Sequence, residues 1–575
     1  MSLRSTMTVC TMDCPDACSL IVSEEPDGRI RIRGNPEHPI TQGFACPKMR
    51  SHLRRLKSHD RIIYPMRRSG TNWERIDWEE ALSLCAEKIQ AYRGEPASIL
   101  YFHGEGAKGA LKQAGHLLFN VLGASGVRGS LCDAAGYSAC RKDFGSNEGS
   151  DIETMLDSSS IVNWGKDLLR SSIHMAFFVR MSRRQGAKVL TISPGSEFNR
   201  AYSDAMICIR PGTDRFLAAA VARLFMDRQA MPKEVMEHSS NYHEFARLIL
   251  ECNLDDLLKR CGVSREQAEL VYEFYANMHP TVTIIGAGLQ RYYSGGETVR
   301  FINALAMLTG NMGIRGGGSF FHLSSLRNFN LSWTRADGKR DIRLLPMPLI
   351  GQEIAKADKP PIRMIWVDGS NVVNQAPNAV KNANAFEGIE FKVVVDAFMT
   401  DTAQRADLIL PSALMLEQED LVASYLHDYV YYARPALDPP GEVKSDFQIF
   451  TELGRRLSPP VVLPDAETCM RHSLDSPYLD VSLEELKGAS FVRAGRKEVA
   501  FEGMVFSHAD EKYRFPDVLR DDPMPPSGFP LRLLSLIRKR SMHSQMLPED
   551  QEMPPRVWIA SDCEALSRLE LDKAC

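Results

Sequence analysis

The sequence predicts a multi-domain α/β protein, in which a small β-rich domain precedes two doubly wound domains built on parallel sheets. The chain has 575 residues, of which 44% are hydrophobic and 25% charged, so it can bury several cores and is too long for one ordinary domain. Short apolar runs alternate with helix-patterned segments through its middle, an order typical of parallel sheets covered by helices on both faces. The N-terminal stretch differs, because closely spaced cysteines and a hairpin pattern replace this alternation.

Four cysteines near the N-terminus have the spacing C-x3-C-x3-C-x27-C, formed by Cys10, Cys14, Cys18 and Cys46. In a chain without export features, such clustered cysteines fit a metal site better than disulfides. Structural zinc usually takes two short cysteine pairs, whereas three close cysteines and a remote fourth are typical of a [4Fe–4S] cluster. We therefore expect a [4Fe–4S] cluster, with zinc as the alternative.

The segment between Cys18 and Cys46 alternates apolar and polar residues on both sides of the turn residues Pro26, Asp27 and Gly28. This alternation predicts a β-hairpin. A loop after the hairpin then carries the fourth thiol back to the other three.

The middle of the chain supplies the elements of the parallel sheets. Strands are predicted in the apolar runs at 97–102, 159–165, 187–193, 281–288, 362–370 and 391–396, and helices at 78–92, 216–228 and 298–310. Almost every strand ends in Gly, Ser, Asn or Asp, and doubly wound sheets bind ligands beyond the carboxyl ends of their strands. Several such ends predict a large, phosphate-bearing cofactor.

A glycine motif, Gly104-x-Gly106-x-x-Gly109, follows the first of these strands and opens a helical segment. The motif matches a nicotinamide-dinucleotide fingerprint, which also needs a second strand that ends in an acid about twenty residues further on. Asp133 lies downstream, but no strand presents it. We favour glycines that let the backbone approach another ligand.

Charge and hydropathy exclude several classes of function. A net charge of −4 provides no basic field for nucleic acid, and the Lys/Arg runs are local. No apolar stretch approaches the length of a membrane span, and no twin-arginine pair precedes the cysteines, so we expect a cytoplasmic protein without membrane insertion. The Pro-rich stretch 521–530 is the clearest linker.

Six motifs in one order resemble the molybdopterin oxidoreductase superfamily, which includes formate dehydrogenases, thiosulfate reductases and acetylene hydratase. They are "TVCTMDCPDACSLIV…GRIRIRGNPEHPITQGFACPK", "RIIYPM…WERIDWEEAL", "PGTD", "ALAMLTGNMGIRGGG", "DAFMTDTAQRADLILPSA" and "PPGEVKSDFQIFTELGRRL". The resemblance implies a [4Fe–4S] cluster held by the four N-terminal cysteines, and two molybdopterin guanine dinucleotides that bind one molybdenum or tungsten ion. It also implies that Lys48, in "CPK", lies between cluster and pterin, where a cation stabilises transferred negative charge; a surface lysine is the plainer alternative.

The resemblance assigns the pterin contacts to strand ends. One set comprises Gly165, Asp167, Ser193, Pro194, Gly212, Asp214, Gly288 and Gln290, and the other Gly369, Asn371, Asp396 and Thr400. Glycines admit a pyrophosphate against backbone N–H groups, and a carboxylate such as that of Asp214 accepts paired donors from guanine. Asp167 and Ser193 depart from the Asn and Asp usual in the family, and a turn or helix-cap role is the alternative for each of these residues.

The metal ligand of the family is a Cys, selenocysteine, Ser or Asp at a fixed distance before a helix-closing glycine. Counting back from Gly145 leads to Cys132, whose soft thiolate suits molybdenum or tungsten, with Cys140 as the rival. Formate dehydrogenases carry histidine at the next position, which is Asp133 here, so formate oxidation is less favoured. Asp133 either handles protons beside the metal or caps the following helix.

The resemblance also implies the domain organisation. We expect an iron–sulfur domain at 1–57, a pterin-binding domain from 58–130 with about 325–460, a second at 131–324, and a shortened, incomplete β-type domain capping the pterins at 525–575. The implied activity moves two electrons between a small substrate and a partner protein or subunit through the cluster. The alternatives are a non-redox hydratase or lyase, in which the metal is a Lewis acid, and an inactive remnant.

Overall fold

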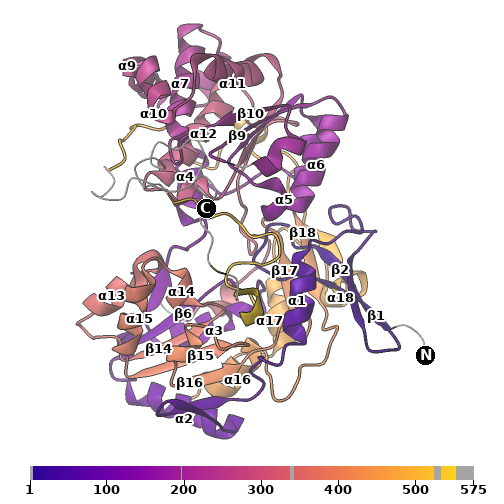
Figure 1. Ribbon diagram of the computed structural model, residues 1–575, viewed down its shortest axis with the longest axis vertical. Helices are drawn as coiled ribbons and strands as arrows, with labels where there is room; N and C mark the ends of the chain where they lie inside the picture. The colour runs from indigo at the N-terminus through magenta and orange to yellow at the C-terminus, as the bar shows by residue number, and fades with distance from the viewer. Residues whose placement is uncertain (1–3, 196, 337–341, 524–532, 552–553, 555–575) are drawn as a thin grey trace.

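Two α/β lobes stand one above the other, with the N-terminal domain beside their junction (Figure 1). The computed structural model describes residues 4–195, 197–336, 342–523, 533–551 and 554. The expected multi-domain α/β fold with parallel sheets is confirmed. The domain boundaries stay a prediction, although each of the two large sheets draws its strands from one of the expected α/β regions.

The N-terminal domain is an antiparallel sheet of β1 (Arg4–Val9), β2 (Ser19–Glu24) and β3 (Ile30–Gly34), followed by helix α1 (Lys48–Leu56). β2 and β3 form the predicted hairpin, in which Glu24 pairs with Ile30. Gly28 has a φ of +76°, a left-handed conformation that favours glycine in this tight turn. The cysteines lie in the loops that flank this hairpin.

The lower lobe contains a six-stranded sheet in the order β5-β4-β16-β15-β14-β6. Its strands are β4 (Met66–Ser69), β5 (Asn72–Arg75), β6 (Ile99–His103), β14 (Met364–Asp368), β15 (Phe391–Asp396) and β16 (Leu408–Pro411). Four strands are parallel, whereas β4 and β5 add an antiparallel hairpin that the sequence did not indicate. Leu100 and Phe102 belong to one core and Tyr101 to the other, so helices cover both faces.

The upper lobe contains a five-stranded, fully parallel sheet in the order β10-β9-β8-β11-β12. Its strands are β8 (Ser160–Trp164), β9 (Lys188–Ser193), β10 (Ala205–Cys208), β11 (Thr281–Ile285) and β12 (Ser319–Phe320). Every residue of β8 and β11 is buried, which explains why both read as continuous apolar runs.

Helices pack on both sheets. Those of the lower lobe are α2 (Trp78–Ala91), α3 (Ala114–Leu122), α13 (Ile350–Lys356), α14 (Val372–Gln375), α15 (Ala379–Glu387) and α16 (Asp446–Arg456). Those of the upper lobe are α4 (Ala134–Phe144), α5 (Leu168–Ser171), α6 (Ile173–Arg184), α7 (Asp214–Asp227), α8 (Glu234–Glu237), α9 (Tyr242–Glu251), α10 (Leu254–Cys261), α11 (Arg265–Asn277) and α12 (Gly295–Leu308). The predicted helices 78–92, 216–228 and 298–310 correspond to α2, α7 and α12.

Two small sheets and two further α-helices lie outside the two large sheets and the helices given above. β7 (Gly126–Arg128) pairs with β13 (Leu344–Pro346), and β17 (Asp420–Ala423), β18 (Tyr429–Ala433) and β19 (Phe491–Arg493) form an antiparallel sheet near α17 (Ala466–Leu474) and α18 (Leu483–Ala489). Most of the expected C-terminal β-type domain lies outside the described residues. Its described part, 533–551 and 554, carries a 3-10 helix at Pro548–Gln551 and no strand.

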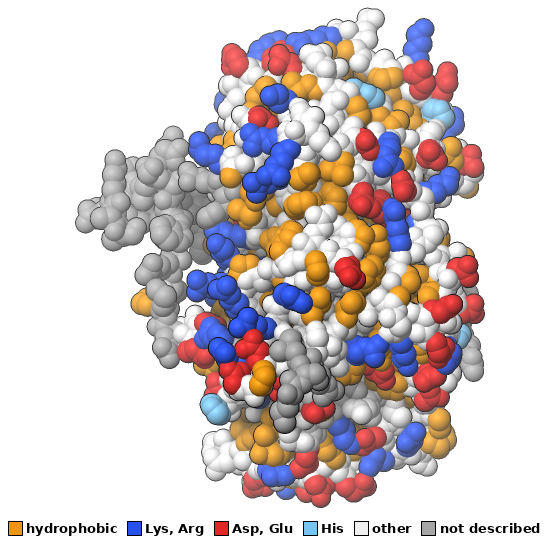
Figure 2. All heavy atoms as spheres, turned by 90° about the vertical axis from the view of Figure 1, so that its right-hand side faces the viewer, with side chains coloured by type: hydrophobic (Ala, Val, Ile, Leu, Met, Phe, Trp, Pro, Cys, Tyr) orange, Lys and Arg blue, Asp and Glu red, His pale blue; other side chains and the backbone are white. Residues whose placement is uncertain are grey.

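The surface carries no single-sign field on the face drawn in Figure 2, where basic and acidic side chains are interspersed around hydrophobic ones. This mixture agrees with the net charge of −4 and with the absence of a nucleic-acid footprint in the sequence. Within the described part of the chain, none of the helices combines the length and apolarity that a bilayer crossing requires.

Arg61 and Glu417 form a buried bidentate ion pair, with N–O distances of 2.6 and 2.8 Å and side chains that are 3% exposed. Replacement of Arg61 by alanine is expected to lower the free energy of unfolding by about 3–5 kcal/mol, because the Glu417 carboxylate stays buried without its partner. Urea denaturation measures the loss. Arg67→Ala is the control, since Arg67 pairs with Glu80 at the surface and its loss should change stability by at most about 1 kcal/mol. Equal losses in the two variants contradict the prediction.

Candidate functional site

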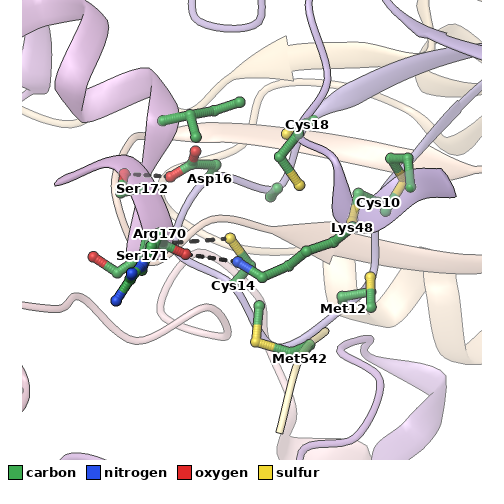
Figure 3. A pocket seen from close by; sticks show the side chains of 14 residues that line it. Cys10, Met12, Cys14, Asp16, Cys18, Lys48, Arg170, Ser171, Ser172 and Met542 are labelled. Carbon is green, nitrogen blue, oxygen red and sulfur yellow. Dashed lines mark hydrogen bonds between the residues drawn. The ribbon is translucent and has the colours of Figure 1, made fainter. Parts of the chain in front are cut away.

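The four N-terminal cysteines line one cavity, as the metal-site prediction requires. Cys10, Cys14, Cys18 and Cys46 surround it together with Lys48 and residues 170–173 of the upper lobe (Figure 3). None of the four thiols forms a disulfide with another cysteine of the described residues. The last carbonyl groups of α5 face the cavity, and the Ser171 oxygen lies 4.0 Å from Cys14 Sγ. The final carbonyl groups of a helix have no partners inside the helix, so they are available to groups outside it.

The electrostatics of this cavity fit a metal cluster. Burial raises the pKa of Cys10 to about 12, and it also raises the pKa values of the Cys14, Cys18 and Cys46 thiols. A metal ion supplies the positive charge that lets buried thiols ionise as ligands, and the four thiols that line this one cavity form the donor set of a cluster. The cysteine cavity therefore suits a [4Fe–4S] cluster.

Lys48 is a buried lysine of this cavity and not a surface lysine. Its side chain is almost fully covered, and its ammonium donates a hydrogen bond to the Arg170 carbonyl oxygen at 2.6 Å (Figure 3). Arg170 belongs to α5, which directly follows Asp167 at the end of strand β8. The lysine thus links the cysteine cavity to the loop in which the sequence predicts pterin contacts.

Cys132 lies at the start of α4, where two side chains hold the backbone. Gln290 accepts hydrogen bonds from the N–H groups of Ala135 and Gly136 at 3.1 and 3.2 Å and donates one to the Cys132 carbonyl oxygen. The Arg291 guanidinium lies 4.0 Å from Cys132 Sγ. Burial, followed by the charges of Asp13 and Asp133, raises the pKa of Cys132 to about 12.

Asp133 occupies the N-cap position of α4 but makes no side-chain cap bond. The Ser130 side chain caps the helix start instead: its hydroxyl oxygen accepts hydrogen bonds from the N–H groups of Cys132, Asp133 and Ala134 at 3.0–3.3 Å. The carboxylate of Asp133 accepts a hydrogen bond from the Ser130 hydroxyl at 3.0 Å and lies 3.7 Å from His322 Nδ1. The alternative in which the Asp133 side chain caps the following helix is therefore wrong, although Asp133 occupies the N-cap position.

Cys140, the rival to Cys132, is a core residue of α4. It is 6% exposed and belongs to the main core of the upper lobe. Its Sγ lies 3.9 Å from Asn303 Nδ2, and burial raises the pKa of its thiol to about 12.

The first predicted pterin set lies along one edge of the upper sheet. Neighbouring parallel strands end at the same edge. The residues at or after the ends of β8, β9, β10 and β11 are Gly165, Asp167, Ser193, Pro194, Gly212, Asp214, Gly288 and Gln290. Asp167 caps α5 by accepting the Arg170 N–H at 3.2 Å, as the plainer alternative for this residue proposed. The Gln290 amide is engaged with α4.

The buried carboxylate of Asp214 shows how this edge of the sheet could accept a guanine nucleotide. It is 1% exposed, its Oδ1 has no hydrogen-bond partner among the described residues, and burial raises its pKa to about 7. A buried carboxylate oxygen without a partner is costly, and the paired N–H donors of a guanine edge satisfy such an atom. An acceptor that needs N–H donors fits the guanine end of the implied cofactor.

The second predicted set lies at the ends of β14 and β15 in the lower sheet. Asn371 Oδ1 accepts hydrogen bonds from the N–H and hydroxyl of Thr402, and Asp396 accepts one from the Thr400 hydroxyl at 3.1 Å. These bonds connect the two loops that follow the neighbouring strands. Asn371 is thereby held against the loop that carries Asp396 and Thr400, and Gly369 lies two residues before Asn371.

The glycine motif of the lower lobe serves contact between two turns. Gly104 N–H donates to the Asp368 carbonyl and Gly106 N–H to the Gly369 carbonyl, both at 2.9 Å. A Cβ on Gly106 would lie 2.5 Å from the Gly369 oxygen, so only glycine fits there. The close partner of these two glycines is the neighbouring strand-end turn, and an approach of their backbone to a ligand stays a prediction.

Several residues of the site escaped the sequence reasoning. Asp16 lies between two of the cysteines in the sequence, and this position was a usable signal. His174 and His322 belong to no motif, and only the fold brings them to the site. Lys166, fully buried at the end of β8, has its pKa lowered by burial. Met542, from the C-terminal segment, lines the cysteine cavity and packs in one core cluster with the hairpin residues Leu20 and Val22 (Figure 3).

Comparison with known proteins identifies the family. The family model for "Molybdopterin oxidoreductase" matches residues 61–456, and that for "Molybdopterin oxidoreductase Fe4S4 domain" matches residues 3–58. The probable oxidoreductase YyaE of Bacillus subtilis is 31% identical over 94% of this chain and 85% of its own length. The F420-dependent formate dehydrogenase subunit alpha of Methanocaldococcus jannaschii is 25% identical, over 80% of this chain and 71% of its own length.

The solved structure of acetylene hydratase from Pelobacter acetylenicus superposes with a TM-score of 0.76, covering 88% of this chain and 77% of that one. At 18% identity, this likeness concerns the fold. The two matched family models name the cofactors, a molybdopterin and a [4Fe–4S] cluster. The chain is therefore an enzyme of the molybdopterin oxidoreductase family, with a [4Fe–4S] domain at its N-terminus.

Proposed function

We propose that this enzyme moves two electrons between a small substrate at a molybdenum or tungsten centre with two molybdopterin guanine dinucleotides, and a partner protein that receives or supplies electrons through the [4Fe–4S] cluster. The observation that carries the proposal is the position of Lys48, which lines the cysteine cavity and donates to the Arg170 carbonyl in helix α5, the helix that follows β8. A buried cation between two redox centres favours electron transfer more than it favours hydration.

Each residue of the cavity has a separate task in this scheme. Cys10, Cys14, Cys18 and Cys46 hold the cluster, which when bound exchanges single electrons with the metal centre. Lys48 stabilises the negative charge that electron transfer brings, because a cation acts strongly where water is excluded. The relative named as a formate dehydrogenase subunit alpha supports a protein partner for these electrons.

Cys132 is the proposed protein ligand of the metal. Its backbone is fixed by Gln290 and Ser130, so the thiol projects from a rigid helix start. Asp133, whose side chain does not cap α4, handles protons beside the metal, with its carboxylate 3.7 Å from His322 Nδ1. The strand-end residues of both sheets hold the two dinucleotides, with Asp214 Oδ1 accepting from a guanine edge.

Metal analysis followed by a dye-linked assay tests the function. The anaerobic protein is first analysed for molybdenum, tungsten, pterin, iron and sulfide, and then assayed with formate, thiosulfate, arsenite and acetylene. Dye-coupled turnover of one redox substrate is the expected result. Hydration of acetylene without dye turnover favours the hydratase alternative, and a protein without pterin is the inactive remnant.

Replacement of Cys132 by serine is expected to preserve fold and pterin content, shift the electronic spectrum of the metal and reduce turnover, because oxygen replaces soft sulfur. Absorption and EPR spectra of variants with equal metal content measure the change. Cys140→Ser is the matched control, since its thiol lies in the core of the same helix. An unchanged spectrum in Cys132→Ser, with a shifted one in Cys140→Ser, transfers the ligand role to Cys140.

A further inference from the structure

Arg215 is a fully buried arginine at the start of helix α7, directly after the predicted guanine contact Asp214. Its guanidinium donates a hydrogen bond to the Gly212 carbonyl oxygen at 2.8 Å, across the turn that carries Asp214. Gly212 has a φ of +77°, and a Cβ there would lie 2.9 Å from the Tyr292 ring, so little space surrounds this turn. Arg215 therefore holds the turn from inside the protein.

Arg215 also connects this turn to a second loop of the first predicted pterin set. Its Nε lies 3.4 Å from a carboxylate oxygen of Glu297, whose side chain is 8% exposed. Glu297 belongs to the first turn of helix α12, and the loop that leads into this helix contains Gly288 and Gln290. One buried guanidinium therefore holds together the loops that follow β10 and β11, in both of which the sequence predicts contacts to a dinucleotide.

The other bonds of the Arg215 guanidinium go to a segment that lies 305 residues further along the chain. The Arg520 carbonyl oxygen accepts from Nε and Nη2 at 3.3 and 3.0 Å, and Asp522 Oδ1 lies 3.0 Å from Nη2. The same Asp522 oxygen accepts a hydrogen bond at 2.9 Å from the hydroxyl of Ser294, the N-cap residue of α12. Residues 520–522, here called the clasp segment, thus contact both Arg215 and the start of α12.

A binding site needs side chains that are held in place, and Asp214 can accept the paired donors of guanine only where its turn fixes the carboxylate. We propose that Arg215 and Asp522 are positioning residues for the guanine end of one pterin dinucleotide, because together they hold the turn of Asp214 in place. This inference rests on the proposed guanine site. Retention of this dinucleotide by the upper lobe then depends on the clasp segment, which lies far from the site in the sequence.

Replacement of Asp522 by asparagine removes one of the two carboxylates that the structure pairs with the buried Arg215 guanidinium. A buried charge that loses a partner is destabilised, so the turn should loosen and the protein should lose one of its two guanine dinucleotides. GMP released by acid hydrolysis, measured relative to the iron of the same sample, gives this loss. Asp521→Asn is the matched control, because Asp521 pairs with Arg260 at the surface, where the two side chains are 74% and 46% exposed, and its GMP content should not change.

A second variant distinguishes positioning from a merely structural role. Asp522→Glu restores the carboxylate, so recovery of GMP in this variant supports the proposal. Arg215→Lys keeps the charge but cannot bridge the two loops, and it should lose GMP as Asp522→Asn does; if it does not fold, Asp522→Asn decides.

Three results overturn the inference: unchanged GMP in Asp522→Asn, an equal loss of GMP in Asp521→Asn, or a parallel loss of iron and GMP, which indicates general unfolding. A wild-type protein without guanine refutes the proposed function together with this inference. A loaded wild type whose Asp522→Asn variant retains both dinucleotides refutes only this inference.

Discussion

Replacement of Cys14 by alanine is expected to remove the whole [4Fe–4S] cluster and to destabilise the N-terminal domain. The wild-type protein, purified anaerobically, should hold about four iron and four sulfide per chain, and the variant neither. Metal-binding energy at such a site is also folding energy, so loss of the cluster lowers the stability of the loops that carry the cysteines. Iron and sulfide analysis, visible absorption and thermal denaturation measure these changes.

Cys85→Ala is the matched control, because Cys85 is fully buried in helix α2 of the lower lobe and belongs to a different core from the cluster cysteines. It should lose some stability but keep all of its iron. One equivalent of zinc in the wild type, without broad visible absorption, would replace the iron–sulfur assignment by the zinc alternative.

Replacement of Lys48 by alanine is expected to slow dye-linked turnover by about tenfold or more, the factor that corresponds to ~1.4 kcal/mol of lost charge stabilisation. Substrate binding should change much less, because Lys48 lines the cysteine cavity and not the surroundings of Cys132. A hydratase passes no electrons through this cavity, so the same variant of a hydratase should lose only the packing of the lysine stem. Steady-state kinetics on wild-type and variant proteins with equal metal, pterin and cluster content distinguish the redox enzyme from the hydratase.

Lys392→Ala provides the comparison for Lys48→Ala. Lys392 is also buried and donates to a backbone carbonyl, that of Ile389 at 2.9 Å, but it lies in strand β15 of the lower sheet. Its loss should affect stability and leave turnover close to that of the wild type. A fully loaded Lys48→Ala enzyme with wild-type turnover in a confirmed redox assay refutes the electron-transfer role.

Local patterns in the sequence predicted the framework of the fold. The N-terminal hairpin and the six apolar strands were predicted at their observed positions, because alternation and continuous burial leave periodic signals in the chain. Parallel packing followed from the alternation of strands with helices, and it placed the strand-end residues of each pterin set along one edge. The edge hairpin of β4 and β5 left no comparable signal, since short strands without a buried residue carry little apolar pattern.

The sequence by itself determined the cysteine spacing, the family and the strand-end positions, because these depend on residues close together in the chain or on motif order. Only the tertiary structure brought Arg170 to Lys48, His174 to Cys18 and Gln290 to Cys132, partners that lie 122, 156 and 158 positions apart in sequence. It also showed that the Ser130 side chain, and not that of Asp133, caps helix α4. The reason is physical: such contacts arise where the upper lobe packs against the cysteine loop and where two loops meet at a sheet edge, and no local periodicity encodes that packing.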